Sequence, residues 1–249
     1  MPIFLEESGK VKKLKVNEKN EIHTDKGKFE YKEDKEIFKT NKGIFYFKSS
    51  YFVDKFKFIK RGPQTSHIKD LGLLFAKVMP QKDWIMLEAG SGSGQVSCFF
   101  ANYVKEIYSF ERRKEFFEIA KKNIEELNLN NVKIFNKDLK EALNLEEIKN
   151  KKFDFIFIDL GEPWNFFELA KEKLKLTGFL AFYIVSPRQL DRLINEWNKY
   201  YRNNFTLIDI FEVIERNWEA KGKEEKFTKP KTTGLMFTAF VVLFRKIEK

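Results

Sequence analysis

From residue 70 onward, segments with a helical pattern alternate with short continuous apolar runs. Such runs are typical of parallel strands that are buried on both faces of a sheet by the helices between them. This part of the chain is therefore predicted to be an α/β domain. The expected helices span residues 71–78, 95–104, 114–127, 164–174 and 187–201, and the expected strands span residues 84–89, 106–111, 132–136, 153–160 and 179–186.

The α/β pattern ends with two strand-like runs, residues 205–216 and 235–245, that have no obvious helix between them. Because parallel strands need a crossover connection, usually a helix, these two runs are expected to pair antiparallel at the edge of the sheet. Residues 221–231 lie between the two runs and are rich in lysine, and we expect them to form a basic loop.

The first 62 residues have a different pattern, in which short alternating runs are separated by polar turns. Asp-Lys-Gly at residues 25–27 and Asn-Lys-Gly at residues 41–43 are typical of hairpin turns, because glycine can adopt positive φ. We predict a small antiparallel β-barrel-like module in residues 1–62 and a second domain in residues 63–249. The expected strands of the module span residues 11–16, 21–24, 28–31, 44–47 and 51–59.

Positive charge is concentrated in this module. Residues 1–62 carry 16 Lys and Arg against 10 Asp and Glu, which supplies +6 of the net charge of +10. Basic side chains interleaved with aromatic ones suit a surface that docks RNA. The aromatic residues could instead form the core of the module, which the pattern favours, whereas the lysines are equally compatible with RNA contact and with a solvated face. The aromatic residues are Phe45, Tyr46, Phe47, Tyr51, Phe52, Phe56 and Phe58.

The composition narrows the class of protein further. An apolar content of 43% and a charged content of 34% are typical of a soluble globular protein. No apolar run is long enough to span a bilayer, so no membrane partner is expected. The single cysteine, Cys98, excludes an intramolecular disulfide and favours the cytoplasm. Two histidines are too few for the usual zinc site, and no metal is expected.

A glycine-rich turn follows the first expected strand of the second domain. Its pattern, acid-x-Gly-x-Gly-x-Gly, consists of Glu88, Gly90, Gly92 and Gly94, and an expected helix begins at Gln95. Glycines permit unusual backbone angles and let N–H groups at a helix N-terminus approach a nucleotide-like ligand. The dinucleotide-binding fingerprint needs glycine where this chain has Gln95. The turn instead resembles the first motif of class I S-adenosylmethionine (AdoMet) methyltransferases, which implies a Rossmann-like fold.

Acidic residues lie at or just beyond the ends of the next three expected strands, and ligands of open α/β sheets bind at the carboxyl ends of strands. Glu111 is placed to accept the two hydroxyls of a ribose. Asp138, next to Leu139, either accepts a hydrogen bond from an adenine amino group or serves as a turn residue. Asp159 is expected to project into the same crevice as the glycine turn, with a helix N-cap as its alternative role.

The segment that begins at Asp159 resembles a family motif. Asp159-Leu160-Gly161-Glu162-Pro163-Trp164 is similar to the Asp-x-x-x-Pro-Trp motif of tRNA (adenine-N1)-methyltransferases, which modify adenine 58 in the T-loop. This motif is much more specific than the glycine turn, which many methyltransferases share. Two positions depart from the family pattern, His67 where tyrosine is usual and Phe237 where histidine is usual. The other segments that resemble the family are Arg61-Gly62-Pro63-Gln64 with Lys69-Asp70, Tyr183, Gln189, Arg216-Asn217-Trp218-Glu219 and Phe237-Thr238-Ala239-Phe240.

The resemblance implies a homotetrameric enzyme that methylates N1 of adenine 58 in tRNA with AdoMet. Asp159 would be catalytic, holding the exocyclic amine of the adenine and stabilising charge on the base. His67, Tyr183 and Gln189 would bind the substrate. The expected AdoMet-binding residues are Gln64, Ser66, Glu88, Gly90, Ser91, Gly92, Ser93, Gly94, Glu111, Asp138, Leu139 and Asp159.

Two other functions are compatible with these patterns. A class I methyltransferase acting on another nucleobase or on a small heterocycle would keep the same glycine turn around a differently built pocket. A non-catalytic RNA-binding protein with a vestigial AdoMet site would use the basic module as its working surface. The intact set of Glu88, Glu111 and Asp159 argues against a vestigial site.

Overall fold

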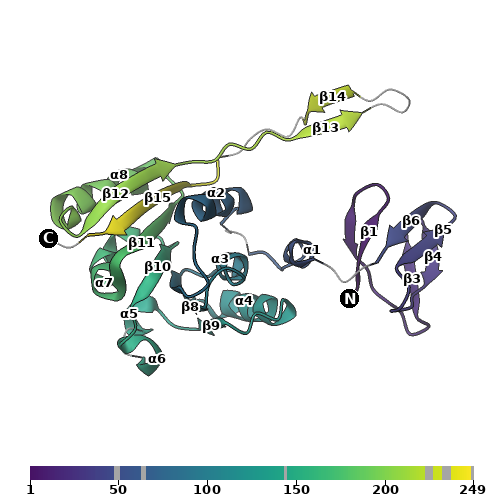
Figure 1. Ribbon diagram of the computed structural model, residues 1–249, viewed down its shortest axis with the longest axis horizontal. Helices are drawn as coiled ribbons and strands as arrows, with labels where there is room; N and C mark the ends of the chain where they lie inside the picture. The colour runs from purple at the N-terminus through teal and green to yellow at the C-terminus, as the bar shows by residue number, and fades with distance from the viewer. Residues whose placement is uncertain (48–50, 63–65, 143–144, 222–226, 232–236, 248–249) are drawn as a thin grey trace. The chain divides into compact units, whose positions relative to one another are not determined.

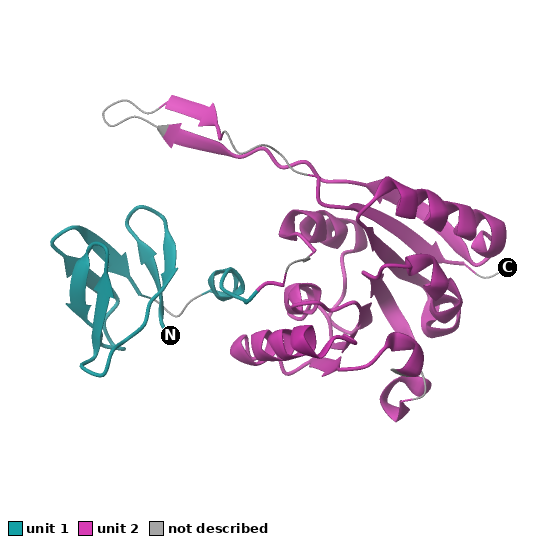
Figure 2. Cartoon of the chain, turned by 180° about the vertical axis from the view of Figure 1, so that it is seen from behind, with its two compact units in different colours: residues 1–60 teal, residues 61–249 magenta. Residues whose placement is uncertain are grey.

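The structure, a computed structural model, describes residues 1–47, 51–62, 66–142, 145–221, 227–231 and 237–247 (Figure 1). The chain divides into two compact units, residues 1–60 and residues 61–249 (Figure 2). Within the described ranges, no helix has both the length and the apolar character needed to cross a membrane.

The first unit is built from short antiparallel strands. Four of them form a sheet in the order β2-β1-β6-β5, and β3 pairs with β4 in a separate hairpin. Phenylalanines from the sheet and apolar residues from the hairpin share one core, in which the rings of Phe4 and Phe38 lie 5.6 Å apart. The strands are β1 (Ile3–Glu6), β2 (Val11–Lys13), β3 (Glu21–Thr24), β4 (Gly27–Glu30), β5 (Ile37–Thr40) and β6 (Gly43–Tyr46).

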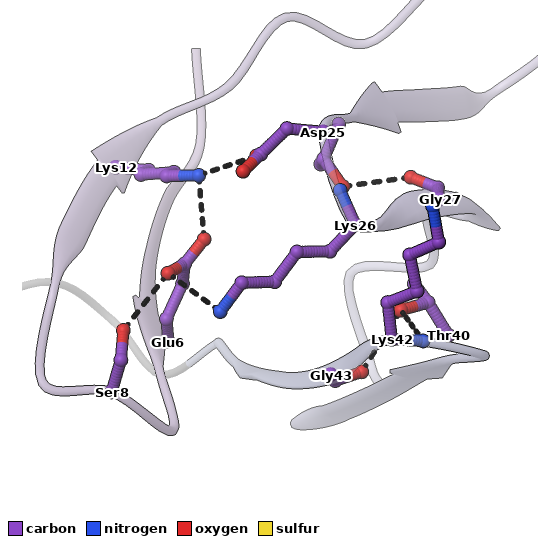
Figure 3. Close-up of polar contacts among 10 residues, drawn as sticks. Glu6, Ser8, Lys12, Asp25, Lys26, Gly27, Thr40, Lys42 and Gly43 are labelled. Carbon is purple, nitrogen blue, oxygen red and sulfur yellow. Dashed lines mark hydrogen bonds and ion pairs between the residues drawn. The ribbon is translucent and has the colours of Figure 1, made fainter.

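The two predicted hairpin turns are confirmed and use the same chemistry. Thr24 pairs with Gly27, and Thr40 pairs with Gly43, so two residues connect the strands in each hairpin. In each turn the threonine hydroxyl donates to the glycine carbonyl, at 2.7 Å from Thr24 to Gly27. The distance from Thr40 to Gly43 is 3.0 Å (Figure 3). The core role favoured for the aromatic residues is confirmed for Phe45, which is fully buried.

The strand expected at residues 51–59 is wrong, because α1 (Phe52–Phe56) is a helix. Phe52 and Phe56 are four residues apart and their ring centroids lie 6.0 Å apart, so the aromatic spacing serves a helix as well as a strand. Strands β1 and β5 are additions that the hydrophobic pattern did not predict.

A buried ion cluster joins the hairpin of β3 and β4 to the sheet of the first unit. Glu6, on β1, has only 2% of its surface exposed. Its carboxylate lies 2.6 Å from Lys12 Nζ on β2 and 3.1 Å from Lys26 Nζ in the turn between β3 and β4, and it accepts a hydrogen bond from Ser8 (Figure 3). The hydrogen bond from Lys12 is the main reason why the pKa of Glu6 falls to about 2.

The second unit is built around a seven-stranded sheet in the order β12-β15-β11-β10-β7-β8-β9. The five strands from β11 to β9 are parallel, whereas β15 pairs antiparallel with both β11 and β12. The predicted α/β domain and its antiparallel pair are therefore confirmed, with β12 at the edge. The strands are β7 (Ile85–Ala89), β8 (Glu106–Phe110), β9 (Val132–Phe135), β10 (Phe153–Ile158), β11 (Leu174–Ile184), β12 (Phe205–Phe211) and β15 (Phe240–Lys246).

Helices cover both faces of this sheet (Figure 1). Phe155 of β10 packs against Phe100 of α3 with a centroid distance of 5.5 Å, whereas its neighbour Ile156 belongs to a cluster with Phe167 of α7 and Leu193 of α8. This alternation is what the two-residue period of a strand requires. The helices are α2 (Ile68–Val78), α3 (Gln95–Phe100), α4 (Lys114–Glu126), α5 (Leu139–Ala142), α6 (Glu146–Lys149), η1 (Pro163–Phe166), α7 (Phe167–Lys173), α8 (Pro187–Glu196) and η2 (Trp197–Tyr201).

A two-stranded arm interrupts the chain between β12 and β15. β13 (Trp218–Lys221) pairs antiparallel with β14 (Phe227–Pro230), with Trp218 opposite Pro230. The loop expected at residues 221–231 is therefore wrong for Lys221 and for residues 227–230, which lie in the paired strands of the arm; residues 222–226 lie outside the described residues. The apolar side chains of Trp218 and Phe227 are exposed on the arm.

Candidate active site

A cavity of about 380 Å³ lies at the carboxyl ends of the parallel strands. All five parallel strands, or the segments that directly follow them, contribute to its lining, and Thr238 before β15 completes it. Within the described ranges, no cluster of three or more His, Cys, Asp or Glu side chains suits a metal ion. The cavity is lined by Ala89, Gly90, Phe110, Glu111, Arg112, Arg113, Lys137, Asp138, Leu139, Asp159, Leu160, Gly161, Tyr183, Val185, Gln189 and Thr238.

The glycine turn brings β7 into close contact with the end of β10. Gly90 has φ of +86°, and a Cβ atom there would lie 1.9 Å from the carbonyl oxygen of Asp159. Only glycine fits this position, because both the positive φ and the missing space exclude a side chain. Gly94 has φ of +77° and is the N-cap of α3. The turn therefore brings Gly90 against the backbone of Asp159 and reaches the N-cap of α3 four residues later.

Glu88 lies beneath the glycine turn and is fully buried. Its Oε2 atom accepts hydrogen bonds from Ser97 and, at 2.7 Å, from Ser109. Burial raises the pKa of Glu88 to about 7. Oxygen atoms of Glu88, Ser93 and Gln95 are buried without a hydrogen-bond partner within the described part of the chain. Of the expected AdoMet-binding residues that the structure describes, Ser66, Glu88 and residues 91–94 do not line the cavity itself.

Glu111 lines the cavity beside the glycine turn, where a ribose-binding acid was expected. Its carboxylate accepts hydrogen bonds from the backbone N–H of Gly92 at 2.9 Å and of Arg113 at 2.9 Å. The Arg113 side chain adds an ion pair at 3.0 Å and lies 4.1 Å from the ring centroid of Phe116. Arg113 is a residue that sequence reasoning missed, because a basic residue at a strand end has no distinctive pattern.

Asp138 and Leu139 follow β9 and also line the cavity. The Oδ1 atom of Asp138 accepts a hydrogen bond from the backbone N–H of Lys140 at 3.0 Å, which is the turn role considered as its alternative. Its position in the lining is equally compatible with contact to a ligand. Gln64 is also an expected AdoMet-binding residue, and it lies outside the described residues.

Residues 59–233 match the family described as tRNA methyltransferase complex GCD14 subunit. The chain belongs to this family.

Two curated relatives and one solved structure extend the match. The tRNA (adenine(57)-N(1)/adenine(58)-N(1))-methyltransferase TrmI of Methanocaldococcus jannaschii is 28% identical over 98% of this chain and 94% of its own length. The tRNA (adenine(58)-N(1))-methyltransferase TrmI of Thermus thermophilus is 28% identical over 76% of this chain and 71% of its own. The crystal structure of tRNA (m1A58) methyltransferase TrmI from Aquifex aeolicus has a TM-score of 0.79 at 24% identity, over 99% of this chain and 97% of that chain, which shows the fold. The predicted family, enzyme class and class I AdoMet-dependent methyltransferase fold are confirmed.

The family motif places Asp159 directly after β10, with Ser66 Oγ donating to its Oδ2 atom at 3.0 Å. Removal of its carboxylate from bulk water raises the pKa of Asp159 to about 6, against the opposing effects of Ser66 and of the positive charge of Arg113. Pro163 begins η1, and Trp164 is buried in the core. Asp159 is thus held by a side chain 93 residues earlier in the chain.

Two of the three expected substrate-binding residues line the cavity. Tyr183 and Gln189 both line it, and Gln189 Nε2 donates to the carbonyl of Gly161 at 3.0 Å. His67 does not line it. The His67 ring caps α2, because its Nδ1 atom accepts from the backbone N–H of Lys69 at 3.3 Å. The backbone N–H of His67 donates to the Tyr183 hydroxyl at 3.1 Å.

Thr238 and Asp70 are further polar residues near the cavity whose roles the sequence did not indicate. Thr238 lines the cavity, and Asp70 is fully buried behind it. A signal was available for Asp70, because it lies on the buried stripe of α2 with Leu71 and Leu74. A charge on an apolar helix face indicates a buried partner.

Proposed function

We propose that this member of the GCD14 family transfers a methyl group from AdoMet to N1 of adenine 58 in the T-loop of tRNA. The observation that carries the proposal is one cavity that is lined both by Gly90 of the glycine turn and by Asp159. The names of the two TrmI relatives, which cover most of this chain, support adenine N1 as the acceptor.

The residues around the glycine turn fit AdoMet. Buried oxygens without partners are costly unless a ligand or water satisfies them, and three such oxygens belong to Glu88, Ser93 and Gln95. The acid at Glu111 suits a ribose. When bound, AdoMet supplies a methyl group on a sulfonium that a nucleophile can accept. We assign its binding to Gln64, Ser66, Glu88, Gly90, Ser91, Gly92, Ser93, Gly94, Glu111, Asp138, Leu139 and Asp159.

Asp159 is proposed as the catalytic residue. Ser66 engages its Oδ2 atom, and this leaves Oδ1 to accept a hydrogen bond from the exocyclic amine of the adenine. A carboxylate there would also stabilise the positive charge that develops on the base. The pKa of about 6 keeps Asp159 largely ionised at neutral pH and able to accept a proton from the product. Alignment of the N1 lone pair with the methyl group of AdoMet supplies much of the remaining rate acceleration.

The base end of the cavity is assigned to Tyr183 and Gln189, with His67 behind Tyr183. N1 lies on the Watson–Crick edge of adenine, so the nucleotide must leave its stack and any pairing before it can enter. A cavity of about 380 Å³ lies within the size range of small-molecule and cofactor sites.

The first unit is proposed as a tRNA contact. Three of its lysines, Lys10, Lys39 and Lys42, have exposed side chains. Phosphate contacts from such lysines position a nucleic acid without reading its sequence. The core buries Phe4, Phe38 and Phe45, and it leaves the lysines, together with the exposed Tyr46 and Tyr51, as side chains available for this role.

We further infer that the active enzyme is a homotetramer in the cytoplasm, as the family resemblance implies. Light scattering of the purified protein tests the assembly, and a particle of any other chain number contradicts it. Fractionation of source cells followed by immunodetection tests the location.

One experiment decides the reaction. The protein is incubated with unmodified tRNA and labelled AdoMet, and the tRNA is digested to nucleosides and to mapped fragments. N1-methyladenosine at position 58 is the expected product. Position 57 is scored in the same map, because the Methanocaldococcus jannaschii relative is named for both positions. A different methylated nucleoside supports the alternative methyltransferase, and AdoMet binding without transfer contradicts catalysis.

A further inference from the structure

A fully buried carboxylate, Asp70, lies behind the base end of the cavity. We propose that Lys69 and Asp70 form a positioning node that fixes the Tyr183 hydroxyl, and with it the wall against which the acceptor base is aligned. This inference rests on the proposed function, because it concerns the placement of the base in the same cavity.

Asp70 holds two hydroxyl groups that belong to the cavity wall. Its Oδ2 atom accepts hydrogen bonds from the Tyr183 hydroxyl at 2.8 Å and from Thr238 Oγ1 at 2.6 Å. Tyr183 and Thr238 both line the cavity, on segments far apart in the sequence. The carboxylate therefore sets the position of two side chains that no local interaction brings together.

Lys69 neutralises this carboxylate and closes the node. Its ammonium group donates to Asp70 Oδ1 at 2.8 Å, to Thr238 Oγ1 at 2.6 Å and to the carbonyl of Val213 at 2.6 Å. Val213 and Thr238 are the two ends of the segment that carries the arm of β13 and β14. One ammonium group thus ties both roots of the arm to the base end of the cavity.

The hydrogen bonds of the node allow a consistent assignment of its protons. The three N–H bonds of Lys69 have three acceptors, and the Thr238 hydroxyl accepts from Lys69 and donates to Asp70. The Tyr183 hydroxyl accepts from the backbone N–H of His67 at 3.1 Å and donates to Asp70. A fully satisfied buried network specifies a single arrangement, whereas a partly satisfied one does not. The phenol of Tyr183 is therefore held in one orientation.

The alternative is that the node only stabilises the fold. Buried ion pairs are weak devices for stability, and well-packed apolar residues often replace them without loss. The node also belongs to the segment that engages Asp159, because Ser66 donates to that carboxylate from four residues before Asp70. One short segment thus bonds side chains at both flanks of the proposed base site.

The test compares two lysines of the same helix. Lys69→Met removes the ammonium of the node, and Lys77→Met removes an ion pair at 2.5 Å between α2 and Asp209 of β12, outside the cavity lining. Single-turnover methylation of tRNA and AdoMet affinity are measured for both variants well below their melting temperatures. A small misplacement of reacting groups can cost about 100-fold. We expect Lys69→Met to lower the methylation rate about 10- to 100-fold with AdoMet affinity unchanged, and Lys77→Met to match the wild type.

A second set separates positioning from stability. If Lys69 acts through Tyr183, the double variant with Tyr183→Phe loses no more rate than the larger single loss. If the rate loss of the double variant equals the product of the two single losses, the inference is wrong. Should Lys69→Met fail to fold, Thr238→Val replaces it, and Thr238→Ser, which keeps the hydroxyl, must restore the rate.

The wild type distinguishes failure of the node from failure of the proposed function. If the wild type forms N1-methyladenosine and Lys69→Met matches Lys77→Met, only the node is contradicted. If the wild type methylates another acceptor, the proposed function fails and the variants are compared on that product. If it methylates nothing, both proposals fail.

Discussion

Two buried glutamates, one in each unit, have pKa values shifted in opposite directions. Glu6 lies against the ammonium groups of Lys12 and Lys26, and its pKa falls to about 2 (Figure 3). Among the residues that the structure describes, Glu88 receives hydrogen bonds from the hydroxyls of Ser97 and Ser109 and faces no ammonium group, and burial raises its pKa to about 7. At neutral pH the same functional group is thus charged in one unit and about half protonated in the other.

The difference shows how the two units use their buried acids. In the first unit the carboxylate is matched by positive charge and joins a hairpin to a sheet, which is a structural use. In the second unit Glu88 and Asp159 both have raised pKa values beside a cavity. Acids whose charge is not matched in this way are typical of sites that await a ligand or a proton.

The largest expected effect tests the cavity side of this comparison. Asp159→Ala removes the carboxylate that accepts the exocyclic amine, and the methylation rate should fall about 100- to 1000-fold, as for loss of other preorganised electrostatic groups. AdoMet binding should remain measurable, because Glu111 and the glycine turn are untouched. Single-turnover methylation and calorimetry measure the two quantities. An unchanged rate would remove Asp159 from the mechanism.

The second effect concerns the surface of the first unit. Changing Lys10, Lys39 and Lys42 together to Glu should weaken tRNA binding about 10-fold or more and lower the salt dependence by roughly one unit of slope per lysine. AdoMet affinity should not change. Filter binding over a range of salt concentrations measures both the tRNA affinity and its salt dependence. The matched control is Lys121→Glu on α4, and equal losses for both variants would show that the first unit has no special role.

The third effect is the pH dependence of catalysis. Asp159 has a raised pKa of about 6, so its ionised form is lost as pH falls through that value. We expect kcat/KM to fall about tenfold per pH unit below pH 6. Asp159→Asn should lack this limb, whereas Glu88→Gln should keep it. If the acidic limb of the wild-type profile instead has its midpoint at pH 7 and is absent in Glu88→Gln, the titrating residue is Glu88 and not Asp159.

The smallest effect tests the opposite pKa shifts through stability. The lowered pKa of Glu6 contributes stability above pH 4.5 that is lost as pH falls toward 2, and solvent screening reduces the loss between pH 6 and pH 3 to about 1 kcal/mol. The raised pKa of Glu88 has the reverse sign, and about 1 kcal/mol is lost as pH rises from 6 to 8. Urea unfolding across this pH range measures both losses. Glu6→Gln should no longer lose stability toward low pH, and Glu88→Gln should no longer lose it as pH rises from 6 to 8. A common pH dependence for both variants would end the comparison.

Much of the site could be predicted because its residues are next to recognisable local patterns. Gly90, Glu111 and Asp159 each follow an apolar run, and the carboxyl ends of parallel strands meet at one edge of a sheet. The helix α1 was missed because phenylalanines four residues apart satisfy two periods at once. The strand β14 was missed because its pairing depends on a partner and not on its own apolar content.

The sequence by itself determined the five alternating strands and the antiparallel edge pair of the second unit, the glycine turn and the family, because each depends on residues close together in the chain. Only the tertiary structure decided which distant side chains meet. Asp70 and Thr238 are separated by 168 positions and share a hydrogen bond, and Ser66 reaches Asp159 across 93. A hydrophobic pattern records which face of an element is buried, but it does not record the partner, since many partners could satisfy the same polar atom.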